Sequence, residues 1–174
     1  MSLHRFYRSF ADFEDLAQQA RAWDLDLRQI DRGRFHGEIL QLVGTDFCFA
    51  EAKFHRTLLQ RGHSPPGLRT IGIPVDDDQC ISWRGSETRS DQLICYPDDG
   101  VLDAVSRPNF HVFAFSLADD AFSEVAQAYK MPEVADCVAD RQIINVPRQQ
   151  MRRLRHALVR IGAALRQHRR CEQE

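Results

Sequence analysis

One arginine stands on a face of small and apolar side chains, and it is the residue best placed to anchor a small ligand. If residues 47–59 form one strand, its even-numbered face carries Cys48, Ala50, Ala52, Phe54, Arg56 and Leu58. An arginine there is unusual because a buried charge needs a partner, and the small side chains beside it leave room inside a barrel. Alternatively, Arg56 pairs with a carboxylate of the chain or extends its guanidinium at the rim.

Aromatic and histidine side chains in later strand-like segments are further candidates for the wall of such a site. Sites for small molecules are mostly apolar and carry a few polar anchors. Phe115 is one further aromatic side chain that fits this description. For His111 the alternative is a hydrogen-bonded core position or a surface position. The candidate ligand-binding residues are Phe54, Arg56, Trp83, Tyr96, His111 and Phe113.

The other chemistry-bearing residues match no catalytic or metal-binding pattern. The seven histidines include no HxH or HxxxH pair, whereas iron, zinc or manganese sites need clustered ligands. The sequence has no G-x-S-x-G elbow, no G-x-G-x-x-G and no P-loop. Its five cysteines are widely spaced and form no CxxC, which favours neither a disulfide framework nor a zinc finger. We expect no catalytic residue, no metal and no cofactor, and therefore no enzyme.

Apolar residues near the C-terminus repeat with the spacing of a coiled-coil seam. Met151, Leu154, Leu158, Ile161 and Leu165 lie 3, 4, 3 and 4 residues apart. They belong to a predicted helix that begins at Pro147 and ends near Arg170. The seam predicts a homodimer interface with the same helix of a second chain, and the alternative is packing against the strands of its own chain.

Arginines occupy the flanks and the outer face of that predicted helix. Residues 141–174 hold nine basic and two acidic side chains, whereas residues 1–140 hold 14 and 23. Helices that read DNA usually add polar or aromatic side chains for base edges, and an acidic body opposes binding. We therefore expect a solvated basic face and no direct binding of nucleic acid by this chain. The arginines are Arg152, Arg153, Arg155, Arg160, Arg166, Arg169 and Arg170.

The pattern along the chain predicts a mainly β fold with a helical appendage. A capping pattern at Ser9 and Asp12 begins a helix that runs to about Trp23. Helices are also predicted at 118–129 and 133–139, and residues 143–146 form an apolar connector. Between the helices, short runs separated by Gly, Pro and Asp turns indicate a sandwich or barrel. The predicted strands are 25–28, 35–43, 47–59, 69–74, 79–84, 92–96 and 109–116.

Nothing in the sequence predicts export or membrane insertion. No run approaches the roughly 20 apolar residues of a spanning helix. The first ten residues lack the apolar core of a signal peptide. Unpaired cysteines are typical of reducing compartments, so we expect a cytoplasmic protein without a membrane partner.

Five runs, in their order and spacing, resemble the N-terminal domain of AraC-type bacterial transcription regulators. The resemblance extends from about Trp23 to Arg170. The runs are residues 23–37 (WDLDLRQIDRGRFHG), 52–56 (AKFHR), 64–70 (SPPGLRT), 83–85 (WRG) and 106–113 (SRPNFHVF).

The resemblance implies a cupin-like jelly-roll sensor over residues 1–116 and a helical dimerisation appendage over residues 117–174. It implies a metal-free, non-catalytic domain that takes a small-molecule effector and regulates transcription. In the family, a domain with two helix-turn-helix units follows and binds DNA. The sequence ends at Glu174, so we expect DNA binding to reside in a domain that this chain lacks. The alternative is a stand-alone enzyme or small-molecule-binding protein on a cupin scaffold, which rests on fold analogy.

Overall fold

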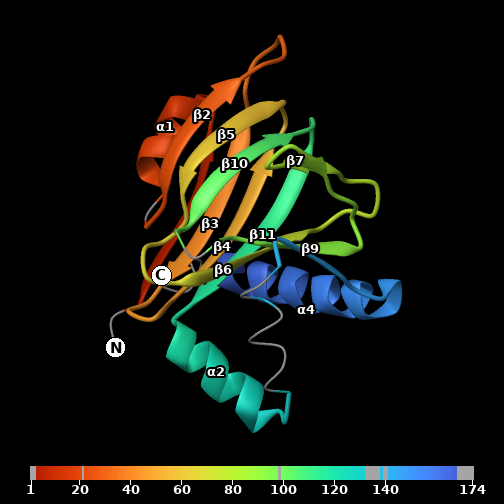
Figure 1. Cartoon of the computed structure of the whole chain (residues 1–174). Coiled ribbons are helices and arrows are strands. Elements are labelled where there is room, and N and C mark those ends of the chain that lie inside the picture. Colours follow the sequence, from red (N-terminus) through yellow and green to blue (C-terminus); the bar gives the residue numbers. More distant parts are fainter. Residues whose placement is uncertain (1–2, 21, 98, 132–137, 139–140, 168–174) are drawn as a thin grey trace.

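Strands dominate the fold, and they form two antiparallel sheets that face each other (Figure 1). The computed structural model describes residues 3–20, 22–97, 99–131, 138 and 141–167. The seven-stranded sheet runs in the order β1 (His4–Phe10), β3 (Gly37–Val43), β4 (Phe47–Phe54), β11 (Phe110–Leu117), β6 (Arg69–Pro74), β9 (Gln92–Cys95) and β12 (Ile143–Asn145). The five-stranded sheet runs in the order β2 (Asp24–Gln29), β5 (Leu58–His63), β10 (Val101–Ser106), β7 (Ile81–Trp83) and β8 (Ser86–Glu87).

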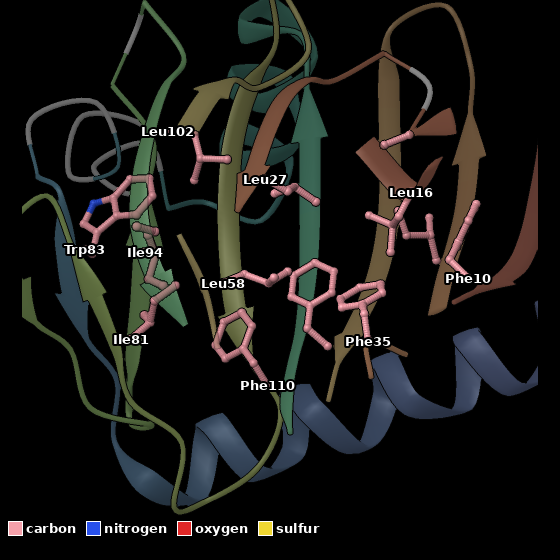
Figure 2. Close-up of a cluster of buried hydrophobic side chains, with 14 residues drawn as sticks. Phe10, Leu16, Leu27, Phe35, Leu58, Ile81, Trp83, Ile94, Leu102 and Phe110 are labelled. Carbon is pink, nitrogen blue, oxygen red and sulfur yellow. The ribbon is translucent and has the colours of Figure 1, made fainter. Parts of the chain in front are cut away.

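The larger hydrophobic core fills the space between the two sheets. Figure 2 shows Trp83, Leu58, Leu102 and Phe110 gathered there from strands of both sheets. Trp83 and Leu58 are almost completely buried. Because successive side chains of a strand point to opposite faces, each strand of the seven-stranded sheet also presents a second row of side chains on its outer face.

Helix α1 (Phe13–Gln19) packs against β1, β2 and β3 beside this core. Its N-cap is Asp12, whose side chain accepts hydrogen bonds from the backbone N–H groups of Glu14 and Asp15. Leu16 is completely buried. The predicted cap at Ser9 was wrong, because Ser9 lies in β1 and the helix begins after Asp12.

Helix α4 (Arg148–Gln167) lies along the outer face of the seven-stranded sheet (Figure 1). Met151 and Leu158 are buried there in a second core with Phe113, Phe49 and other residues of the sheet. Both faces of this sheet are therefore covered, one by the opposite sheet and one by the helix.

Helix α2 (Asp119–Ala128) extends away from the sheets (Figure 1) and confirms the helix predicted at 118–129. Arg69 Nε lies 2.6 Å from Asp119 Oδ1 and ties the first turn to β6. Val125 and Tyr129 are exposed. The helix predicted at 133–139 lies outside the described residues, apart from Val138. Of the helices that the structure describes, none is both long and apolar enough to cross a membrane.

The predicted fold class, mainly β with a helical appendage, is confirmed, and the arrangement is consistent with a cupin-like jelly roll. The strand predicted at 47–59 is instead two strands, β4 and β5, because the chain passes from one sheet to the other at residues 55–57. That corner contains no Gly or Pro, so no turn signal marks it. The prediction also missed β1, β8, β10 and β12.

Candidate functional site

A cavity of about 70 Å³ lies between the two sheets. Small side chains on the inner face of the seven-stranded sheet make the space: Ala50 on β4 pairs with Ala114 on β11, and Ala52 pairs with Val112. Gln60 on β5 and Leu102 on β10 face them from the other sheet. Both sheets and the segment after α1 contribute to the wall, which gives the cavity the mostly apolar lining of a small-molecule site.

Four side chains with polar atoms reach this wall: Gln41, Gln60, Trp23 and Tyr96. Gln41 and Gln60 are buried, and the Nε2 atom of Gln60 has no hydrogen-bond partner in the described part of the chain. The buried indole N–H of Trp23 also has no hydrogen-bond partner in the described residues, although the Cys48 thiol, a weak acceptor, interacts with Trp23. Burial raises the pKa of the Tyr96 phenol well above its usual range, so this side chain stays neutral.

Three of the six predicted ligand residues lie at or beside the cavity. Phe54 and Tyr96 line it. Trp83 packs behind Tyr96, with ring centroids 4.6 Å apart, and Trp23 meets the same ring edge-on at 5.7 Å. These aromatic side chains form one packed cluster beside the cavity.

Arg56 lies at the rim, and its predicted place inside the barrel was wrong. Because β4 ends at Phe54, the alternation that pointed Arg56 inward does not continue to it. Arg56 Nε donates to the carbonyl oxygen of Arg34 at 3.1 Å, and Nη1 lies 3.8 Å from the Asp31 carboxylate. Gly33, against which this guanidinium lies, has a φ of +124°, a backbone conformation that strains any other residue, so glycine is favoured there. Arg56 thus holds a loop in place.

His111 and Phe113 also lie outside the cavity, on the outer face of the seven-stranded sheet beneath α4. The inward row of β11 is Phe110, Val112 and Ala114. Both rows of this strand are apolar because both faces of the sheet are covered, so polarity gives no indication of which row faces inward. Phe115, weighed with them, belongs to the outer cluster as well.

Helix α4 is attached to the sheet through a buried carboxylate. Glu51 on β4 is 3% exposed; its Oε1 lies 2.8 Å from Nε2 of His111, and its Oε2 lies 2.6 Å from Nη2 of Arg166 in a close ion pair. Burial alone would raise the pKa of Glu51, but the hydrogen bond with His111 and the pairing with Arg166 outweigh it and hold the pKa below its usual value. The Lys53 ammonium lies 3.9 Å from Oε1.

Arg155 fixes the N-terminal half of the same helix. This side chain was expected on the flank or outer face of the helix, and that prediction was wrong: Arg155 is 6% exposed. Its Nε donates to the carbonyl oxygen of Pro74 at 2.8 Å, and its other nitrogens bind the Asp77 carboxylate and the Ser90 carbonyl oxygen. The burial of Arg155 could not be predicted from the helix sequence, because it depends on loops that are distant in the sequence and cover this side chain.

The predicted seam is divided between two surfaces. Met151, Leu158 and Leu165 pack on the chain's own sheet. Leu154 and Ile161 are 36% and 47% exposed, and Val159 is exposed on the opposite flank of the helix. The part of the seam that is available to a second chain is therefore Leu154 with Ile161. Arg169 and Arg170 lie outside the described residues.

Sequence reasoning missed Trp23, Gln41 and Gln60 as site residues. The available signal was a glutamine in an otherwise apolar inward row, as in Ile39 and Gln41 or in Leu58 and Gln60.

Burial raises the pKa of Cys48 to about 11, which keeps this thiol protonated. Within the described ranges, no group of three or more His, Cys, Asp or Glu side chains is placed to hold a metal ion.

No protein-family model matches the sequence. No curated protein matches it either. A solved structure with a similar fold is the AraC-like transcriptional activator CuxR, with a TM-score of 0.53 and 10% sequence identity over 73% of this chain. The match covers 52% of CuxR, so the chain corresponds to about half of that protein. Vicilins from Corylus avellana and Capsicum annuum, 12% identical over 77% and 78% of this chain and 49% and 48% of theirs, have TM-scores of only 0.37 and 0.35. At 10% identity, the likeness to CuxR shows a shared β-rich fold and no more.

Proposed function

We propose that this chain is the effector-sensing and dimerising part of an AraC-like transcription regulator, in which a separate domain contacts DNA. The fold shared with CuxR supports a regulatory ligand-binding domain in general. The finer assignment adds a small-molecule effector in the cavity and a response through α4. It gives this chain no reaction to catalyse, no cofactor, and a cytoplasmic location.

The observation that carries the proposal is the position of Glu51. On β4, Ala50 and Ala52 face the cavity, and Glu51 between them holds α4 through Arg166. On β11, Val112 and Ala114 face the cavity, and Phe113 between them packs under α4. A molecule that displaces the cavity-facing side chains of these strands therefore also displaces Glu51 and Phe113, on which the helix packs. A ligand shifts the helix only if it binds two arrangements with different affinity.

In this proposal, α4 also forms the dimer interface. Leu154 and Ile161 are seven residues apart on one side of α4 and exposed. A contact between two copies at these residues would join α4 of one chain, the helix that responds to the ligand in this proposal, to α4 of the other. Arg152, Arg153 and Arg160 are exposed on α4, so an antiparallel pair separates the like charges better than a parallel pair.

Hydrogen exchange tests the coupling between cavity and helix. Ala52→Val adds two methyl groups to the cavity on the sheet that carries α4. Ala104→Val adds the same volume to the interior on β10, in the sheet that does not carry it. We expect Ala52→Val to accelerate exchange of the amides at 158–166 several-fold more than Ala104→Val does. Equal exchange in both variants would overturn the proposed route to the helix.

A further inference from the structure

The cavity between the sheets has the chemistry of a site for an uncharged molecule. None of the described residues that line it carries a charge. Arg56, the nearest candidate for an anion anchor, is engaged at the rim by Arg34 and Asp31. An ion that entered this space would lose its hydration without gaining a counter-charge, which is strongly unfavourable.

Two buried donors in the wall have no hydrogen-bond partner among the described residues, and they are the side chains of Gln60 and Trp23. The indole N–H of Trp23 has the Cys48 thiol beside it, whereas Gln60 has no such neighbour in its strand pairing. Gln60 is 8% exposed, and its Nε2 has no hydrogen-bond partner among the described residues. Its cross-strand neighbours are Leu27 on β2 and Ala104 on β10, whose side chains offer no acceptor. Buried donors are nearly always paired, because an unpaired donor destabilises the fold. A donor that is retained here and lines the cavity indicates an acceptor supplied by a ligand.

The size of the cavity limits that ligand. At about 70 Å³ it is smaller than the cavity of roughly 150 Å³ that binds benzene in an engineered protein. Alanines form the wall opposite Gln60, and an aromatic cluster lies beside the cavity at Tyr96. Such a space suits an apolar body of a few carbon atoms.

We propose that the cavity binds a small, uncharged, mostly apolar molecule that presents one oxygen acceptor, such as a carbonyl, to Nε2 of Gln60. The inference names the ligand class of the effector site and rests on the function proposed above. A hydrogen bond from Gln60 then selects among molecules of equal size, since only an acceptor satisfies the unpaired donor.

Three probes of five non-hydrogen atoms each separate the effect of charge from the effect of a hydrogen-bond acceptor. Butanone is neutral and has an acceptor, propionate is charged, and cyclopentane is neutral without an acceptor. Titrations followed by the amide resonances of β4, β5 and β11 give the dissociation constants. We expect butanone to bind about 5- to 10-fold more tightly than cyclopentane, the value of one net hydrogen bond. We expect propionate to leave these resonances unchanged.

The variant Gln60→Met keeps the shape of the side chain and removes the donor. We expect it to abolish the preference for butanone over cyclopentane and to unfold at or above the wild-type temperature, because an unpaired donor is gone. A merely structural glutamine would instead lower that temperature. Leu59→Met, on the adjacent position whose side chain points to the other face of β5, is the matched control and should behave as wild type.

Each result bears on the ligand class or on the sensing role. Tighter binding of propionate than of butanone would overturn the ligand class and leave the sensing role standing. Equal butanone affinity in wild type and Gln60→Met would overturn the role of Gln60. Binding of butanone that leaves the resonances of α4 unchanged would support the ligand class and contradict the proposed function. Failure of all three probes to shift the cavity resonances would overturn the ligand class.

Discussion

Glu51 and Arg155 are ionisable side chains that the fold buries beneath the same helix, and their surroundings make them differ in function. Arg155 is satisfied by two backbone carbonyl oxygens and one carboxylate, so it joins loops to the helix as a fixed part of the structure. Glu51 is held by His111 and Arg166, and its charge can be removed by a proton. One is a permanent attachment and the other depends on pH.

Replacing Arg155 tests the permanent attachment. Arg155→Met leaves the carbonyl groups of Pro74 and Ser90 without a donor and should lower the free energy of unfolding by about 2 kcal/mol. Arg153→Met, on the exposed side of the same helix, should change it by less than about 0.5 kcal/mol. Urea denaturation measures both. Equal losses would mean that Arg155 contributes only its helix propensity.

Acid should loosen the pH-dependent attachment. Since the pKa of Glu51 is lower in the folded chain than its ordinary value of 4.5, the unfolded state takes up the proton first. The contribution of Glu51 to stability is therefore complete above pH 4.5 and is lost as the pH falls through the folded pKa.

Thermal unfolding between pH 7 and pH 3 checks this dependence. Glu51→Gln should lose about 1–2 kcal/mol at neutral pH, because Arg166 loses its partner, and should show a flatter decline in acid than wild type. Glu124→Gln, on exposed α2, should keep the wild-type profile. A wild-type slope in Glu51→Gln would assign the acid sensitivity to other groups.

At the scale of elements, α4 approaches the sheet closely because of one glycine. A Cβ at Gly162 would lie 2.5 Å from Oε2 of Glu51, so a side chain there requires the buried carboxylate or the helix to shift, and the carboxylate is the partner of Arg166. Gly162 therefore has a low helix propensity but allows the C-terminal half of α4 to approach the buried Glu51 carboxylate.

Gly162→Ala tests this close approach against helix propensity. Alanine is favoured over glycine in a helix by about 1 kcal/mol, yet we expect a net loss of about 1 kcal/mol because the Glu51 contacts are displaced. Ala163→Gly, at the exposed neighbouring position, measures the propensity alone in the same helix. Chemical denaturation gives the free energy of unfolding of both variants. A higher free energy of unfolding for Gly162→Ala than for the wild-type protein would contradict the close approach.

The sequence predicted those elements whose patterns are local. The strand at 69–74 and the helix at 118–129 were predicted within one residue because Gly, Pro and Asp or a helical stripe mark them. The passage from β4 to β5 was missed because no turn residue marks the corner. The split seam and the outward row of β11 could not be predicted, because they depend on which surface covers each face, and that is set by contacts distant in sequence.

For the molecule as a whole, the acidic body and the basic C-terminal region are complementary. Arg148, Arg155 and Arg166 of α4 pair with Asp91, Asp77 and Glu51 of the body. Part of the charge asymmetry along the sequence is thus neutralised within one chain. Other arginines of α4, among them Arg152 and Arg160, remain exposed.

Self-association is the prediction that belongs to this scale. We expect a dimer at high micromolar concentration by sedimentation, and a monomer when Leu154→Glu and Ile161→Glu are combined, because the exposed part of the seam then carries like charges. Val125→Glu, on the exposed side of α2, should leave the dimer intact. A monomeric wild-type protein, or a dimer that survives the double change, would contradict an α4 interface.

The short pairing of β12 with β9 has a mechanical consequence. It anchors the chain at the sheet edge just before α4 begins, and Arg155 secures the first turns of the helix beside it. The far end is held by the ion pair of Glu51 with Arg166, by the packing of Leu165 on the sheet, and by the ring of Tyr7, which lies 5.4 Å from the Arg166 guanidinium. Because its two ends are held by different contacts, we expect a small displacement of β4 to move the C-terminal end of the described helix, near Gln167, more than its N-terminal end.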